Sequence, residues 1–217
     1  MSNATLNLLL LATGQTLYMV LVSGAVAILG GLPLGVLLFT TRKHGILANE
    51  LWNRGLGMIV NCIRSIPFVI LLVALIPLTR LLMGTSIGTN AALVPLSICA
   101  IPFVGRLVEN ALTELYSGLI EAGHSMGASP WQIIRKILLP EALPGIINCI
   151  TVTLINLVGY SAMAGAVGGG GLGSVAINYG YQRFNPGIML ITIVILIILV
   201  QLLQHGGDWL AKKLDHR

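Results

Sequence analysis

Residues 186–205 read PGIMLITIVILIILVQLLQH and contain no Asp, Glu, Lys or Arg. A helix needs about 20 predominantly apolar residues to cross the hydrocarbon core of a bilayer. Only 9% of the 217 residues are charged, whereas a soluble domain has roughly a quarter. The β-branched residues at 191–200 do not indicate strands, because a membrane barrel would need apolar and polar residues to alternate. The sequence therefore predicts an all-α integral membrane protein.

Four more apolar stretches predict spanning helices, which gives five in total. They cover about 14–41, 62–83, 88–106 and 143–165. We expect the first span to be bent or loosened around Gly30, Gly31 and Pro33, with residues 2–12 in the membrane interface ahead of it. No segment outside these spans is long enough to build its own core. Residues 1–217 are therefore predicted to form a single transmembrane domain.

The distribution of Lys and Arg predicts the orientation. With the N-terminus outside, ten of the twelve positive residues fall on one side, which the positive-inside rule makes cytoplasmic. They are Arg42, Lys43, Arg54, Arg64, Arg106, Arg135, Lys136, Lys212, Lys213 and Arg217, whereas only Arg80 and Arg183 fall on the other side. Among these, Arg64 is predicted to lie near the inner end of the second span, with its side chain reaching the headgroups. The C-terminus is predicted to be cytoplasmic.

The cytoplasmic segment between the third and fourth spans, about 112–142, is longer than an ordinary helix connection. Residues 118–126 predict a short helix that ends at Gly127. A second short helix is predicted to begin with Ser129 as its cap, Pro130 in the first turn and Gln132 at the capping-box spacing. It is expected to present Ile133, Ile134, Ile137 and Leu138 on one face and to stop at Pro140. A plain connector on the bilayer surface is the alternative interpretation.

The spacing within this segment is similar to a motif of the permease subunits of bacterial binding-protein-dependent ABC importers. That motif reads E-A-A, three residues, G, nine residues, I, one residue, L-P. The matching residues are Glu121, Ala122, Gly127, Ile137, Leu139 and Pro140, with Gly123 in place of the third motif residue. The stretches at 64–68, 83–88 and 159–163 resemble the methionine-importing branch of that family.

The resemblance implies a fold and a set of partners. The chain would have the five-span fold of a type I importer permease, in which the segment Ser129-Pro130-Trp131 begins a helix that docks on a cytoplasmic ATPase. Two ATPase subunits, a second copy of this chain and a periplasmic or lipid-anchored binding protein are implied. ATP and Mg²⁺ would bind the ATPase, so no cofactor is expected on this chain. Glu121 is expected to brace the loop through hydrogen bonds to backbone amides or a nearby base.

The translocation path is predicted along the fourth span. Thr153, Asn156, Tyr160 and Met163 are spaced by three, four and three residues and so share one helical face. These side chains line a path for a small polar substrate, or else they hold the helices together by hydrogen bonds. Met163 is a candidate apolar plug near the outer end.

No motif in this sequence identifies a source of energy for transport. Residues 65–79, 81–105 and 142–182 contain no ionisable Asp, Glu, Lys, Arg or His, which disfavours an ion-coupled carrier. The glycine run at 168–173 lacks the lysine of a phosphate-binding loop and is interpreted as a flexible outer loop over the pore. No catalytic, metal-binding or nucleic-acid site is predicted. Another amino acid or small solute as substrate, or a passive channel, remains an alternative.

Overall fold

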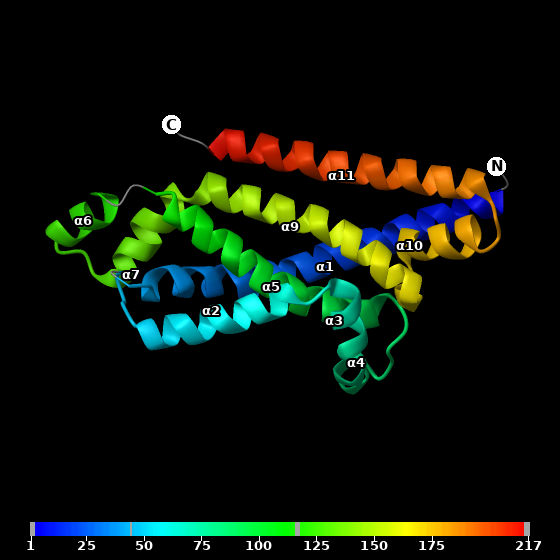
Figure 1. Cartoon of the computed structure of the whole chain (residues 1–217). Coiled ribbons are helices and arrows are strands. Elements are labelled where there is room, and N and C mark those ends of the chain that lie inside the picture. Colours follow the sequence, from blue (N-terminus) through cyan, green and yellow to red (C-terminus); the bar gives the residue numbers. More distant parts are fainter. Residues whose placement is uncertain (1–2, 44, 116–117, 215–217) are drawn as a thin grey trace.

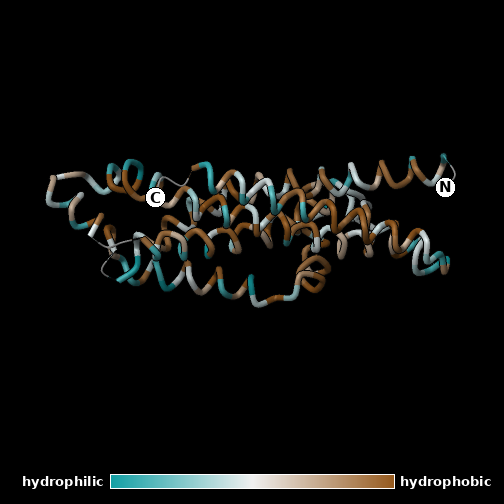
Figure 2. Tube along the Cα trace, turned by 90° about the horizontal axis from the view of Figure 1, so that it is seen from above, coloured by the Kyte–Doolittle hydropathy of each residue, from teal (hydrophilic) through white to brown (hydrophobic). Residues whose placement is uncertain are grey.

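The computed structural model describes residues 3–43, 45–115 and 118–214, and all regular elements in these ranges are helical. Four helices are long and apolar enough to span a membrane: α1 (Asn3–Thr41), α5 (Thr89–Thr113), α9 (Leu143–Ala164) and α11 (Pro186–Leu214). They run lengthwise through the molecule, with α11 along one side and the shorter α2, α3 and α4 on the opposite side (Figure 1). Hydrophilic residues gather at the two ends, and apolar residues dominate the long helices between them (Figure 2).

The predicted second span is broken in the structure. It consists of α2 (Glu50–Ser65) and α3 (Phe68–Ala74), which meet at an angle of 102°, followed by α4 (Ile76–Met83). Pro67 explains the break, because a proline disfavours helical geometry at the residue before it, and Ile66 is extended. Counting the bent pair as one span gives the five that the sequence predicts. The prediction of one helix over 62–83 was wrong, because this stretch is broken and α2 begins twelve residues earlier.

The first span is a single helix, not a loosened one. Residues 3–12, expected in the interface, form the first turns of α1, where Leu9 and Ala12 are buried together with Leu172 and Val175. Pro33 lies inside the helix without ending it. A Cβ on Gly31 or Gly35 would lie 2.5 or 2.6 Å from atoms of Val104 and Gly105 in α5. These glycines therefore bring α1 and α5 into close contact.

Segment 165–181, which we call the outer segment after its predicted side, is packed and mostly helical, with non-helical backbone at Val167 and Gly168. This corrects the prediction of a flexible glycine loop. It comprises η2 (Gly165–Gly169), α10 (Gly171–Val175) and η3 (Ala176–Tyr181). The first backbone amides of α10 donate to α1: Gly171 N to Gln15 Oε1 at 2.8 Å and Leu172 N to Thr16 Oγ1 at 2.9 Å. The side chains of Gln15 and Thr16 thus accept hydrogen bonds from the first amides of α10, which have no partners within that helix.

Candidate coupling loop and translocation path

The segment that the sequence singles out protrudes at one end of the bundle. There, α6 (Gly118–Ser125) and α7 (Pro130–Ile133) extend beyond the long helices, at the end where α11 finishes (Figure 1). The start of α1 lies at the opposite end (Figure 1). An odd number of crossings places the two ends of a chain on opposite sides of a membrane, so this arrangement agrees with five spans.

The turn after α6 has the hydrogen bonds of a Schellman motif. Ala128 N donates to Gly123 O at 3.0 Å, and Gly127 N donates to His124 O at 2.9 Å. Gly127 has a φ of +74°, which side-chain-bearing residues rarely adopt. The predicted helix stop at Gly127 is therefore confirmed, and its cause is the left-handed backbone that this motif requires.

The predicted start of the second helix is also confirmed. Gln132 N donates to Ser129 Oγ at 3.4 Å, and Ser129 N donates to Gln132 Oε1 at 2.9 Å, which together form a capping box with Pro130 in the first turn. Hydrogen bonds therefore define the geometry of this segment at the glycine turn and at the helix cap. A connector without internal structure would not show these paired hydrogen bonds.

The helix does not stop at Pro140, contrary to the sequence prediction. It passes from α7 into the π-helical turn η1 (Ile134–Leu138) and then into α8 (Leu139–Glu141), which leads directly to α9. Leu139 N donates to Ile134 O across the wide turn, and Pro140 falls in the first turn of α8, where a helix tolerates a missing amide hydrogen. A continuous helical path therefore connects the loop to the fourth span.

One face of this path anchors the loop to the bundle. Ile133, Ile134 and Leu138 are buried in the main apolar core together with Val108 of α5 and Ile146 of α9, as the spacing predicts. Ile137 and Leu139 are partly buried against the same core, whereas Arg135 and Lys136 point outward. This shared packing attaches the loop to α5 and α9.

The opposite side of the loop is exposed and partly apolar. Met126 is 87% exposed and Trp131 is 66% exposed, and Glu121 and Ala122 are also on the surface. The Glu121 carboxylate makes no hydrogen bond or ion pair with the described residues, so the expected bracing within the chain is not found. Met126 was missed by the sequence reasoning, although its place in the turn just before Gly127 was a usable signal.

The four path candidates of α9 have different surroundings. Thr153 is 1% exposed, and its hydroxyl donates to Cys149 O at 2.7 Å within the same helix. Asn156 is half-buried, and Tyr160 stacks on Phe68 of α3 with ring centroids 4.7 Å apart. Met163, near the end of α9 that leads into η2, is 46% exposed. Thr153 is therefore buried and cannot line an open path, whereas Tyr160 lies beside the break between α2 and α3.

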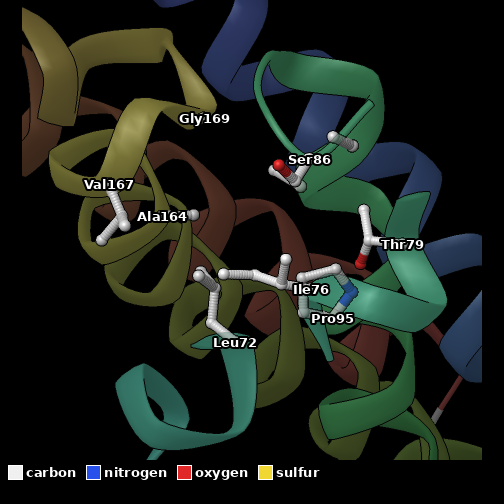
Figure 3. A pocket seen from close by; sticks show the side chains of 10 residues that line it. Leu72, Ile76, Thr79, Ser86, Pro95, Ala164, Val167 and Gly169 are labelled. Carbon is white, nitrogen blue, oxygen red and sulfur yellow. The ribbon is translucent and has the colours of Figure 1, made fainter. Parts of the chain in front are cut away.

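A cavity beneath the outer segment is too small for a substrate. It lies among α3, α4, α5 and η2, where Thr79 and Ser86 are its hydroxyl-bearing side chains (Figure 3). Its volume is about 20 Å³, which is room for about one water molecule. No group of three or more His, Cys, Asp or Glu that would hold a metal ion occurs among the residues the structure describes.

Comparison with known proteins defines the class. The family described as the inner membrane component of binding-protein-dependent transport systems matches residues 27–217, so this chain belongs to that family. It is therefore a multi-pass component of the inner membrane, and the family is one of transport subunits and not of enzymes.

Individual relatives and solved structures give a more specific comparison than the family as a whole. A probable D-methionine transport system permease protein MetI from Vibrio cholerae is 61% identical, covering 97% of this chain and 94% of the relative. The corresponding protein from Haemophilus influenzae is 53% identical, over 95% and 97% of the two chains. A solved structure of the MetNI methionine ABC transporter in an inward-facing conformation contains a chain 53% identical, with a TM-score of 0.98 over 100% of both chains. A chain of an amino acid ABC transporter, 17% identical with a TM-score of 0.79, shares the fold.

Proposed function

We propose that this chain is the permease subunit of an ATP-driven importer that carries methionine, in its L- and D-forms, across the inner membrane. The substrate assignment is supported by relatives 53–61% identical over nearly the whole chain, which are described as D-methionine permeases. No methionine-binding group is recognisable from the residues themselves. The observation that carries the proposal is the exposed, internally capped loop at 118–142, whose buried face is fixed to two long helices.

The proposed assembly has two copies of this chain and two copies of a cytoplasmic ATPase, with a binding protein that delivers substrate from outside. ATP and Mg²⁺ would bind the ATPase, and this chain would bind no cofactor. The N-terminus would face outward and the loop and C-terminus would face the cytoplasm, as the ten-to-two distribution of positive residues supports. Residues 1–217 form one transmembrane domain in this proposal, with the coupling loop at about 112–142.

The loop has distinct parts in the proposed mechanism. Ala122, Met126 and Trp131 would contact the ATPase, with Glu121 available to donors on that partner. Gly127, Ser129 and Pro130 would fix the shape of the loop, while Ile137, Leu139 and Pro140 would continue the helix into the bundle. ATP binding would change the separation of the ATPase subunits and so move α5 and α9. The chemical energy enters because the ATPase binds one permease conformation better than another.

The conformation described here is proposed to be inward-facing, because it superposes on a chain of an inward-facing transporter with a TM-score of 0.98. In that state the exposed Met163 and the half-buried Asn156 and Tyr160 remain candidates for the path.

Co-expression with the partner ATPase tests the proposal. The purified complex in liposomes, with the binding protein outside and ATP inside, is expected to accumulate labelled methionine. Uptake of another amino acid in preference to methionine would overturn the substrate assignment. Equilibration of methionine without ATP would indicate a passive channel.

A further inference from the structure

Helix α2 has three distinct faces. Leu56, Val60 and Ile63 pack toward the bundle, and Asn53 fixes this side to α1 by donating to Leu38 O at 2.6 Å and to Thr41 Oγ1 at 3.1 Å. At 100° per residue, Trp52 and Ile59 share a second face, which is exposed and apolar and does not line the groove described next. The third face is polar and exposed, and it carries Arg54, Asn61, Arg64 and Ser65.

The polar face borders an open groove. The groove has a volume of about 740 Å³, and it runs between α2 and Arg106 of α5. Arg106 Nη2 donates to Asn61 Oδ1 at 3.4 Å across it, while Arg106 Nη1 forms an ion pair with Glu109 at 2.6 Å. The neighbouring wall positions add Met58, Cys62 and Ile66, so the groove has both polar and apolar surface.

The far end of the groove is lined by Ser65 and Ile66, and Arg64, which does not itself line the groove, lies directly beside them. Arg64 lies in the last turn of α2, roughly 20 Å along the helix from Glu50 at 1.5 Å per residue. The centre of its guanidinium is 6.0 Å from the ring of Phe103, which lies near the middle of α5. Arg64 is therefore not at the inner end of a span, as the sequence predicted, and snorkelling to the headgroups does not explain it.

A charged side chain at this depth is costly unless it faces water or a partner charge. Arg64 has no ion pair with the described residues. Beyond it the groove ends at the bend between α2 and α3, where Phe68 stacks on Tyr160. A water-filled path from the cytoplasm to this aromatic pair would explain why α2 has a polar face, why that face extends as deep as Arg64, and why the groove ends at the bend.

We infer that the polar face of α2 lines the cytoplasmic half of the translocation path, and that Arg64 attracts the carboxylate of a zwitterionic amino acid as it leaves. This inference rests on the proposed importer function. The apolar part of the groove at Met58 and Ile66 suits an apolar substrate side chain. The path thus follows α2 on the cytoplasmic side, and α9 contributes Tyr160 at its inner limit.

Cys62 is a native reporter for this groove, because it is exposed whereas Cys99 and Cys149 are buried. The experiment uses the complete complex in liposomes, first measured for ATP-dependent uptake. A charged, membrane-impermeant thiol reagent is then applied from the ATPase side, without nucleotide or with ATP and vanadate. In a Cys62→Ser background, Ser65→Cys reports the polar face and Ile59→Cys is the matched control on the exposed apolar face of the same helix.

Cys62 and Ser65→Cys are expected to react at least about tenfold faster without nucleotide than in the vanadate-trapped state, and Ile59→Cys is expected to react slowly in both. Arg64→Gln should lower uptake at least fivefold without lowering ATP hydrolysis, while Arg64→Lys retains most of the uptake. Protection of Cys62 in both states, equal labelling of Ile59→Cys, or normal uptake by Arg64→Gln would overturn the inference. Where uptake by the parent complex is ATP-dependent, such a result leaves the importer assignment intact.

Discussion

The loop 118–142 and the outer segment 165–181 are both short helical pieces interrupted by glycines with positive φ, but the outer segment also needs glycine for close packing. A Cβ on Gly127 would meet nothing within 4 Å, and only its positive φ requires glycine. A Cβ on Gly173 would collide with the carbonyl oxygen of Ala162, and one on Gly165 would lie 2.6 Å from Gly170 O. The loop 118–142 has a defined backbone conformation but protrudes from the bundle, whereas the outer segment is packed into it. Glycine content alone therefore does not indicate mobility.

The largest effect is expected from Gly173→Ala. The added methyl group would contact backbone atoms of α9, which cannot rotate away, so we expect a loss of about 3 kcal/mol or more in stability. For a chain of this size, each 1 kcal/mol lowers Tm by roughly 2–4 °C. Thermal unfolding of the purified protein in detergent measures the change. Gly159→Ala is the matched control, because Gly159 has open space and helical alanine is favoured by about 0.5–1 kcal/mol. Equal Tm values for the two variants would contradict the packed description of the outer segment.

Gly127→Val should affect function more than stability. A left-handed conformation costs a side-chain-bearing residue about 1–2 kcal/mol, so the turn is expected to change shape locally. ATP-driven uptake should fall at least about tenfold, while Tm changes by only a few degrees. Gly127→Asn, which tolerates this backbone region, should retain most of the uptake. Normal uptake by the valine variant would show that the shape of this turn is not needed for coupling.

Thr16→Val tests the attachment of the outer segment. It removes the acceptor for Leu172 N and leaves a buried amide without a partner, which costs about 1–3 kcal/mol. Hydrogen exchange within 171–176 should accelerate. Thr13→Val is the control on the same helix, because Thr13 donates only to Leu9 O and receives no bond from another segment. Unchanged exchange in Thr16→Val would mean that packing alone holds α10.

The smallest effect is expected from Gly123→Ala, which restores the alanine of the family motif. The new Cβ would lie 3.0 Å from Ile137 Cδ1 and 3.2 Å from Ile133 Cγ1, and the ends of such side chains can shift. We expect a change within about 0.5 kcal/mol, as for most substitutions that cause no serious clash. Thermal unfolding and uptake assays check this. A decrease in Tm of more than about 5 °C would show that the isoleucine contact is rigid.

The sequence predicted those features that depend on local chemistry. Apolar length predicted that there are five spans, although not where each begins, and the spacing of Ser129 and Gln132 predicted the capping box that the structure contains. Gly127 was recognised as a helix stop because its role is local too. These predictions need no knowledge of distant parts of the chain.

The features that were missed depend on contacts between distant residues. The glycines at 165–173 are fixed by α1 and α9, and nothing local shows that Gln15 and Thr16 cap α10. Pro140 was expected to end a helix, but a wide turn places it where proline is tolerated. Pro67 was the available signal for the broken second span. Because α2 begins at Glu50, Arg64 lies deeper in the bundle than a span beginning at residue 62 suggested.

The central claim is that loop 118–142 receives force from an ATPase subunit. Met126→Cys and Phe184→Cys, each in a Cys62→Ser background, provide a direct test, because both native side chains are 87% exposed. Met126 lies on the loop, and Phe184 lies just after the outer segment, between η3 and α11. A bifunctional thiol cross-linker applied to the assembled complex should join Met126→Cys, and not Phe184→Cys, to the ATPase subunit. Cross-linking to the ATPase at Phe184→Cys, or at neither position in a complex that still takes up methionine, would contradict the account.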